Sequence, residues 1–228
     1  MHLIDLSITV HDHDGRLGLE TRFDTPYSFD NCGWQGSTVS MFCHYGTHVD
    51  APVHFIKGGA GIHDAPLGKL IGPAGVIDLS DHGAGAGIAA DTLEDRGRQV
   101  VPGDIVILRT GWTDACWGAE PFWKSGPYLC IDGAEWLVER GVKAIVYDFA
   151  EEEAVRKTGF RGEDCVVHHT ILGQDIYNIE YVHGLAKLSA PRCGIVALPI
   201  KLHGLDGAPA RVVAIEGLDL PREFRVSG

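Results

Sequence analysis

The chain has 228 residues and a formal net charge of −12 at pH 7, so it repels nucleic-acid phosphates and anionic membranes, and we expect neither as a partner. No run of about 18 apolar residues occurs, which excludes a membrane-spanning helix. Because 45% of the residues are hydrophobic, the chain can bury a large core, and we expect a single domain over residues 1–228.

The cysteines indicate a reducing compartment. The chain has 6 of them, scattered without CxxC spacing, which in a chain of this length is typical of reduced thiols rather than of a disulfide framework. The N-terminal stretch MHLIDLSITV has no basic region before its short apolar run, so it lacks the pattern of a secretion signal. We therefore expect a cytoplasmic protein.

Strand-like and helix-like segments follow one another along the chain. Segments rich in Val, Ile and Leu predict strands at 4–10, 39–44, 75–79, 105–109, 144–148, 195–199 and 211–216. Apolar residues at three- and four-residue spacing predict helices at 88–96 and 133–140, which run into Gly97 and Gly141, and acidic residues open a third helix at 163–172. This mixture predicts an α/β domain.

Residues 44–54 read HYGTHVDAPVH, and four ionisable side chains in them share one parity: His44, His48, Asp50 and His54. A helix separates these side chains, because at about 100° per residue Asp50 lies about 200° from His48. A straight strand separates them too, since about 3.3 Å per residue places His44 roughly 33 Å from His54. A strand that bends at Gly46 and Pro52 brings them together, because glycine tolerates unusual dihedrals and proline ends the ladder.

Imidazoles and a carboxylate gathered in this way are ligands that suit Zn²⁺ and Mn²⁺. We therefore expect His44, His48 and Asp50 to hold a divalent ion, and the carboxylate of Asp50 also allows a bridge to a second ion. His54 is either a fourth ligand or an acid/base, because an ordinary histidine pKa of about 6.5 suits proton transfer at neutral pH. The chemistry indicated is hydrolysis by metal-activated water.

A second group of ionisable residues lies in the stretch HHTILGQDIYNIE, residues 168–180. The adjacent His168 and His169 point about 100° apart on the predicted helix, so we expect only one of them to face a site. Glu180 follows a short strand-like stretch beyond Gly173 and can return to the same cavity. The residues alone do not decide which histidine joins it.

The stretch at residues 44–54 matches every fixed position of the pattern HxGTHxDxPxH, and with it the chain resembles the cyclase-family metal-dependent hydrolases, which include bacterial kynurenine formamidase and isatin hydrolase. The likeness covers nearly the whole chain, through the segments DLS, HFIKGG, PLGKLIGPAGVIDL, ILRTGW, AEWLVERGVKAIVYD, HHTILG and LPIKLHGLDGAPARVVAI. It implies an α/β domain with the family's swivelling β/β/α core, assembled as a homodimer or homotetramer.

The resemblance also implies roles for individual residues. The metal ligands that it implies are His44, His48, Asp50, His168 and Glu180. Glu180 lies twelve residues after His168, which is the spacing of the second ligand pair in the formamidases, and this favours His168 over His169. His54 is implied as the proton donor and acceptor. Isatin hydrolase relatives use one Mn²⁺ and formamidases are described with zinc, so the expected cofactor is one or two ions of Zn²⁺ or Mn²⁺.

The resemblance implies a small-molecule substrate with an amide-type carbon–nitrogen bond, either an N-formyl aromatic amine or a cyclic amide such as an isatin-type ring. The segment between DLS and the metal motif departs from the family, because it lacks the proline-rich stretch found in formamidases. Within that segment, Phe29 and Trp34 are the candidates for contact with a flat substrate ring.

Two other functions use the same residues. A lactone or ester hydrolase, or a dehydrating cyclase, would place a different carbonyl compound on the same metal centre, and the fold does not choose among these reactions. A non-catalytic metal-binding protein would keep the ligands but has no need of His54 beside an open metal position. Asp148, at the end of a predicted strand, is expected to cap the following turn rather than to join the site.

Overall fold

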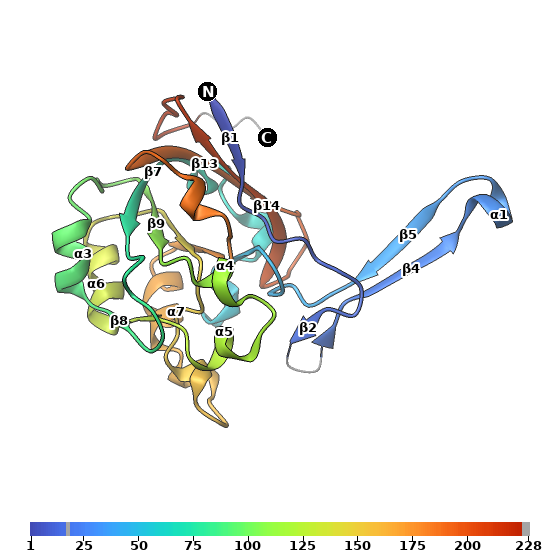
Figure 1. Ribbon diagram of the computed structural model, residues 1–228, viewed down its shortest axis with the longest axis horizontal. Helices are drawn as coiled ribbons and strands as arrows, with labels where there is room; N and C mark the ends of the chain where they lie inside the picture. Colours follow the sequence, from blue (N-terminus) through green and yellow to red (C-terminus); the bar gives the residue numbers. More distant parts are fainter. Residues whose placement is uncertain (17–18, 225–228) are drawn as a thin grey trace.

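The computed structural model describes residues 1–16 and 19–224, and its central feature is a mixed sheet that closes on itself (Figure 1). In spatial order the strands are β1 (His2–Asp5), β14 (Gly207–Glu216), β13 (Arg192–Pro199), β7 (Ile71–Asp78), β9 (Ile105–Arg109), β11 (Ala144–Tyr147), β12 (Tyr177–Glu180) and β6 (His48–Asp50). Because β6 pairs with β14 as well as with β12, the sheet forms a barrel-like ring to which β1 adds an edge.

One part of the ring is parallel and carries helices. Strands β7, β9, β11 and β12 run parallel to one another, and parallel neighbours need crossover connections. The crossovers contain α3 (Ala90–Arg96), α6 (Ile131–Glu139) and α7 (Val166–Leu172), which lie together on one side of the sheet (Figure 1). The predicted α/β class is confirmed.

Both faces of the parallel strands are buried. In β9, Ile107 belongs to the cluster inside the ring with Val49 of β6, whereas its neighbour Leu108 belongs to the cluster beneath the helices with Leu93 of α3 and Leu137 of α6. Successive strand residues point to opposite faces, so a strand covered on both sides is apolar throughout rather than alternating. This is why the stretch at 105–109 predicts a strand so clearly.

Most predicted elements lie where the sequence places them. The structure has a strand at 105–109 and helices that end just before Gly97 and at Glu139, two residues before Gly141. The third helix begins at Val166 rather than at residue 163, because residues 162–164 form a separate 3-10 turn in which the Asp164 carboxylate accepts the Arg161 N–H at 2.8 Å.

Two predicted strands are wrong. The strand expected at 4–10 ends at Asp5, although the Leu6 N–H still donates to the Val212 carbonyl at 2.9 Å. The strand expected at 39–44 ends at Ser40, and residues 42–45 turn, with the Tyr45 N–H donating to the Phe42 carbonyl at 3.1 Å. In both places an apolar run continues past the residues that a neighbouring strand can pair, so the strand stops first.

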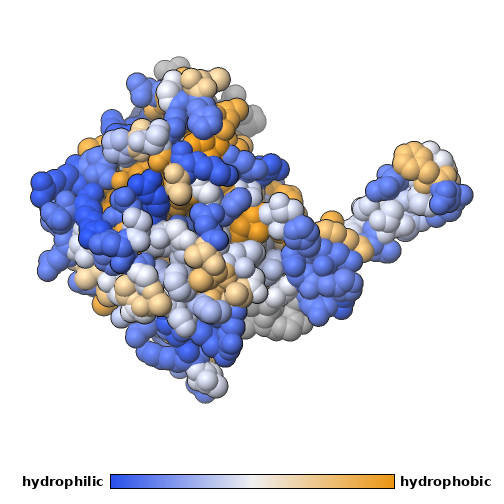
Figure 2. All heavy atoms as spheres, viewed as in Figure 1, coloured by the Kyte–Doolittle hydropathy of each residue, from blue (hydrophilic) through white to orange (hydrophobic). Residues whose placement is uncertain are grey.

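Residues 22–40 form an arm that projects from the body of the molecule (Figure 1). The arm is a separate two-stranded sheet of β4 (Arg22–Tyr27) and β5 (Gly36–Ser40), joined at the tip by α1 (Phe29–Cys32). Hydrophobic side chains crowd its tip, as Figure 2 shows, and the rings of Tyr27 and Trp34 stack at 4.6 Å.

The remaining elements are short. They are β2 (Gly15–Arg16), β3 (Leu19–Glu20), β8 (Gly87–Ile88), β10 (Tyr128–Leu129), α2 (Leu67–Leu70), α4 (Trp112–Cys116) and α5 (Glu120–Lys124). Within residues 1–16 and 19–224, no helix has the length and apolar character needed to cross a membrane.

Candidate metal centre

The stretch that holds the first group of ionisable residues bends twice, as its glycine and proline predict. His44 lies in a turn before β6, and Gly46 has a φ of +70°, a conformation that glycine adopts without steric cost. Strand β6 then carries His48 and Asp50 on one face, and Pro52 opens a 3-10 turn that ends at His54. The two bends bring side chains ten residues apart into one cluster.

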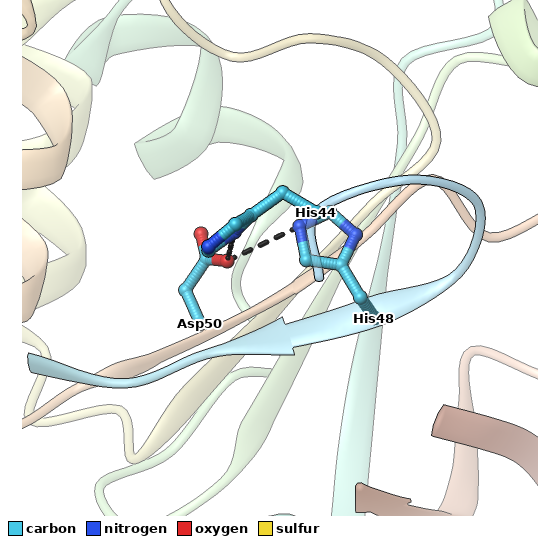
Figure 3. Close-up of side chains that lie close together, drawn as sticks. All are labelled: His44, His48 and Asp50. Carbon is cyan, nitrogen blue, oxygen red and sulfur yellow. Dashed lines mark hydrogen bonds and ion pairs between the residues drawn. The ribbon is translucent and has the colours of Figure 1, made fainter. Parts of the chain in front are cut away.

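Asp50 lies at the centre of the cluster and is fully buried. Its Oδ1 is 2.6 Å from His44 Nδ1 and 3.1 Å from His48 Nε2 (Figure 3). Its other oxygen, Oδ2, is 3.6 Å from His168 Nε2. The carboxylate of Asp50 therefore stands between two groups of nitrogen donors.

Two other elements complete the second group. In the pairing of β6 with β12, Glu180 is opposite His48, and the Glu180 carboxylate reaches both sides, with Oε2 3.6 Å from His48 Nε2 and Oε1 3.4 Å from His168 Nε2. Helix α7 supplies His168, which is buried, whereas His169 is exposed and faces the Gly162 carbonyl. The structure thus brings His168, and not His169, to Glu180.

The two most deeply placed imidazoles are held in defined tautomers. The His48 Nδ1–H donates to the Gly46 carbonyl at 2.8 Å, and the His168 Nδ1–H donates to the Glu152 carboxylate at 3.1 Å. Each Nε2 therefore presents a lone pair to the cluster. Metal-binding histidines in proteins are held in this way, with the distal nitrogen donating to a carbonyl or a carboxylate.

His54 lies on the open side of the cluster. Its ring stacks on that of His44 at 3.8 Å, and its Nδ1 is 3.4 Å from an Asp206 oxygen that also lies 2.9 Å from His44 Nε2. The side chains of His54 and Asp206 are 22% and 43% exposed, while those of His48 and Asp50 are 0% exposed. His54 and Asp206 therefore mark the solvent-facing side of the cluster.

The side chains of the cluster lack the positive charge that would balance their carboxylates. Burial would lower the pKa of His44, but the Asp50 charge and the hydrogen bond to Asp206 outweigh it and raise that pKa to about 10. Burial would raise the pKa of Asp50, yet His44 and His48 hold it well below the usual range. Burial, reinforced by the charge of Glu180, raises the pKa of Glu151 well above its usual range. Without another cation, a proton on His44 has to offset part of the negative charge of the carboxylates.

Four buried side-chain atoms of the cluster have no hydrogen-bond partner. They are His48 Nε2, Asp50 Oδ2, Glu151 Oε2 and Glu180 Oε1. Buried polar atoms are nearly always paired in folded proteins, so a group of unpaired ones requires a ligand. Imidazole nitrogens and carboxylate oxygens within 4.8 Å of one another fit a divalent transition-metal ion.

The structure separates the remaining predicted residues from the cluster. Phe29 and Trp34 lie on the arm with 71% and 52% exposure, away from the metal centre of their own chain (Figure 1). Asp148 caps a turn, but not the turn after it that the sequence predicts: its carboxylate accepts the N–H groups of Thr110 and Gly111 and the Thr110 hydroxyl, which follow β9.

Three acidic residues at the cluster are absent from the sequence-based site. Glu151 and Glu152 follow β11 in the stretch YDFAEEE, and Asp206 lies just before β14. The carboxyl ends of parallel strands collect ligands in α/β sheets, so the acidic run after a buried strand is a signal that identifies the first two. For Asp206, only the segment LHGLDGAPAR that carries the family resemblance gives any signal.

Comparison with known proteins places this site in a family. The chain is 30% identical over 198 residues to the kynurenine formamidase of Bacillus cereus, covering 83% of this chain and 88% of the relative. Its fold matches isatin hydrolase A from Labrenzia aggregata with a TM-score of 0.80 at 21% identity, over 94% of this chain and 93% of that one.

A second solved structure agrees. It is described as a predicted metal-dependent hydrolase from Bacillus stearothermophilus, with a TM-score of 0.73 and 25% identity, and the match covers 93% of this chain and 97% of that one. The Cyclase family model matches residues 4–154, which include the whole HYGTHVDAPVH stretch. The chain therefore belongs to the Cyclase family.

Proposed function

We propose that this protein is a metal-dependent hydrolase that cleaves an amide-type carbon–nitrogen bond outside peptides, in an N-formyl aromatic amine or in a cyclic amide such as an isatin-type ring. The observation that carries the proposal is the convergence of unpaired buried ligand atoms from β6, β12 and the segment that follows β11 beside a partly exposed histidine. The names of the similar proteins, kynurenine formamidase and isatin hydrolase, support this substrate class.

The donor atoms divide into two positions that share Asp50. His44, His48 and Asp50 form the first position, and His168 and Glu180 form the second with the other oxygen of Asp50. We propose Zn²⁺ or Mn²⁺ as the cofactor, in one or both positions. When bound, such an ion supplies Lewis acidity, which polarises a carbonyl group and makes a water molecule more acidic.

His54 performs the proton transfers in this proposal. Breaking the carbon–nitrogen bond leaves a nitrogen that must gain a proton, because an amide anion is a poor leaving group. The His54 imidazole lies at the entrance with Nδ1 facing Asp206 at 3.4 Å, so its Nε2 is left to face the substrate. Asp206 holds His44 and His54 against each other and stabilises the protonated imidazole.

We further propose that the protein is a homodimer or homotetramer in which a second copy covers the arm. A two-stranded hairpin is at best marginally stable in water on its own. The arm nevertheless exposes five large apolar side chains: Phe23, Tyr27, Phe29, Trp34 and Val39. Phe29 and Trp34 can then contact substrate only across such an interface, because the arm points away from the metal centre of its own chain (Figure 1).

Light scattering tests the assembly. The wild type should have the mass of a dimer or tetramer, and replacing both Phe29 and Trp34 by Asp should shift it toward the 24.6 kDa chain, because the charges prevent burial of the arm tip. If the two aromatic residues also touch substrate across the interface, the single variants Phe29→Ala and Trp34→Ala should raise KM. A wild type with the mass of one chain contradicts the proposal.

A substrate panel tests the function itself. Metal-free protein is reconstituted with zinc or manganese and assayed on N-formyl aromatic amines, isatin-type lactams, lactones and aryl esters. We expect turnover of an amide substrate that depends on added metal and is lost in His54→Ala. Hydrolysis of lactones or esters alone contradicts the amide assignment. An absence of any metal-dependent turnover contradicts the proposal that the protein is a metal-dependent enzyme.

A further inference from the structure

Glu151 is the least explained side chain of the cluster. It lies after β11 at the carboxyl end of the parallel strands and is 2% exposed. Its Oε1 is 3.0 Å from His168 Nε2, and its Oε2 has no hydrogen-bond partner. One donor atom each from Glu151, His168 and Glu180 lie within 4.8 Å of one another. A buried carboxylate placed so close to a second one is stable only with a proton or a cation between them.

The two glutamates that follow in the chain differ from Glu151. Glu152 is also buried, but its Oε1 accepts the backbone N–H of His168 at 2.7 Å and lies 3.1 Å from the ring nitrogen His168 Nδ1. Glu152 therefore orients the imidazole from behind. Glu153 is exposed and forms an ion pair with Lys157 at 3.2 Å. Of the three, only Glu151 turns its carboxylate toward the cluster.

Because the Nδ1–H of His168 donates a hydrogen bond to Glu152, the neutral imidazole presents its Nε2 lone pair to three carboxylates. The nearest oxygens belong to Glu151 at 3.0 Å, Glu180 at 3.4 Å and Asp50 at 3.6 Å. A lone pair and three negatively charged groups repel one another unless a proton or a metal ion lies among them. The four oriented groups are the donors that an oxygen-preferring divalent ion takes.

We propose that Glu151 is a ligand of the second metal position, together with His168, Glu180 and Asp50, and that this position is richer in oxygen than the first. The inference rests on the proposed function and extends it. The first position has two imidazoles and one carboxylate, a set that suits zinc, whereas three carboxylates and one imidazole suit manganese better. The two positions therefore differ in the metal that they select.

The charge balance agrees with two ions. Asp50, Glu151, Glu152 and Glu180 are buried carboxylates, which together carry four negative charges when ionised. Two divalent ions would supply the four positive charges that balance them. Glu151 is also poorly placed to carry protons to the substrate, because it is 2% exposed while the His54 side chain is 22% exposed.

Metal titration of matched variants tests this assignment without measuring activity. Metal-free wild type, Glu151→Gln and Glu153→Gln are titrated with Mn²⁺ and with Zn²⁺ by calorimetry, and the bound metal is counted by elemental analysis. We expect wild type and Glu153→Gln to bind two equivalents of Mn²⁺. In Glu151→Gln the affinity for one equivalent should fall about 100-fold or more, because losing a direct ligand costs at least as much as losing an outer partner.

The other equivalent should bind Glu151→Gln with unchanged affinity, because His44, His48 and Asp50 remain. The variant Glu151→Ala guards against weak binding by the glutamine oxygen, and a thermal melt of each metal-free protein confirms that it folds. The role of Glu151 is overturned if Glu151→Gln and Glu151→Ala both bind two equivalents with wild-type affinity, or if the wild type binds only one equivalent. Either result leaves the proposed function standing. A wild type that binds no metal overturns the proposed function as well.

Discussion

Asp148 and Asp50 are both fully buried carboxylates near the edge of the same sheet, but their surroundings are opposite. The Asp148 oxygens accept two backbone N–H groups and a hydroxyl, at 2.6 to 3.1 Å, all from Thr110 and Gly111. Asp50 has imidazoles around it, and its Oδ2 has no hydrogen-bond partner. The first carboxylate is satisfied by the chain alone, and the second is not.

The comparison shows how a structural acid differs from a ligand. Neutral N–H and O–H donors fixed by the backbone compensate a buried carboxylate permanently. The imidazoles of His48 and His168, whose Nδ1–H groups are engaged elsewhere, leave Asp50 facing lone pairs, which only a proton or a metal ion relieves. Burial and acidity are common to both sites, so the donors that surround the carboxylate distinguish them.

The largest expected effect is the loss of metal from Asp50→Ala. Asp50 is proposed to ligate both positions, so its removal should leave less than about a tenth of the wild-type metal content and lower turnover by about 1,000-fold or more. Elemental analysis after dialysis measures the first and steady-state kinetics the second. Asp148→Ala is the matched control and should keep its metal. Full metal retention in Asp50→Ala contradicts the ligand assignment.

The matched substitution, Asp148→Ala, should lower the free energy of unfolding but leave the metal content unchanged. It leaves the N–H groups of Thr110 and Gly111 without an acceptor, and an unpaired buried donor costs about 1 to 3 kcal/mol. At pH 7 we expect the free energy of unfolding in urea to fall by about 2 kcal/mol. An unchanged stability, or a loss of metal without a loss of stability, removes the contrast between the two sites.

We also expect the difference in stability between wild type and Asp148→Ala to depend on pH. Burial raises the pKa of Asp148 from 3.8 to about 6, in spite of its hydrogen bonds. The folded state then binds the proton more tightly than the unfolded state, so the stabilisation is fully present below pH of about 4 and is lost as pH rises through about 6. The difference in unfolding free energy between metal-free wild type and Asp148→Ala should shrink by about 2 kcal/mol from pH 4 to pH 7. A difference that grows over this range contradicts the direction of the shift.

The variant His54→Ala tests the role of the open side of the cluster independently of its buried ligands. It removes the proposed proton carrier but none of the three ligands of the first position, so turnover should fall by about 100-fold while metal content stays at the wild-type level. Kinetics and elemental analysis on one preparation measure both. Normal turnover refutes the acid/base role, and a loss of metal makes His54 a ligand instead.

The smallest effect is expected at the surface pair of Arg211 and Asp5. Its guanidinium and carboxylate make two contacts, but the side chains are 74% and 46% exposed. Exposed ion pairs contribute about 0 to 1 kcal/mol, so Arg211→Ala should change the free energy of unfolding by less than about 1 kcal/mol. A loss as large as that of Asp148→Ala would show that exposure is a poor guide to the value of charged groups here.

Local pattern predicts those parts of the molecule that local chemistry determines. The strand at 105–109 and the helices that end near Gly97 and Gly141 follow from apolar spacing and from glycine at a helix end. The bends at Gly46 and Pro52 follow from geometry, because no regular structure gathers the four side chains of that stretch.

Long-range contacts are what the pattern does not contain. Asp206 contacts His44 from 162 positions away, and apart from the family resemblance of its segment nothing distinguishes it from other loop acids. Glu151 and Glu152 follow a strand, but their different orientations depend on where α7 packs. The place of Phe29 and Trp34 on a projecting arm depends on the path of residues 22–40 through space, which composition does not predict.

Anomalous X-ray diffraction from crystals of the metal-loaded protein tests the central claim most directly. The account predicts an anomalous peak about 2.0 to 2.2 Å from His44 Nδ1, His48 Nε2 and an Asp50 oxygen. A map with no peak among these three side chains, from protein shown to contain metal, would contradict it.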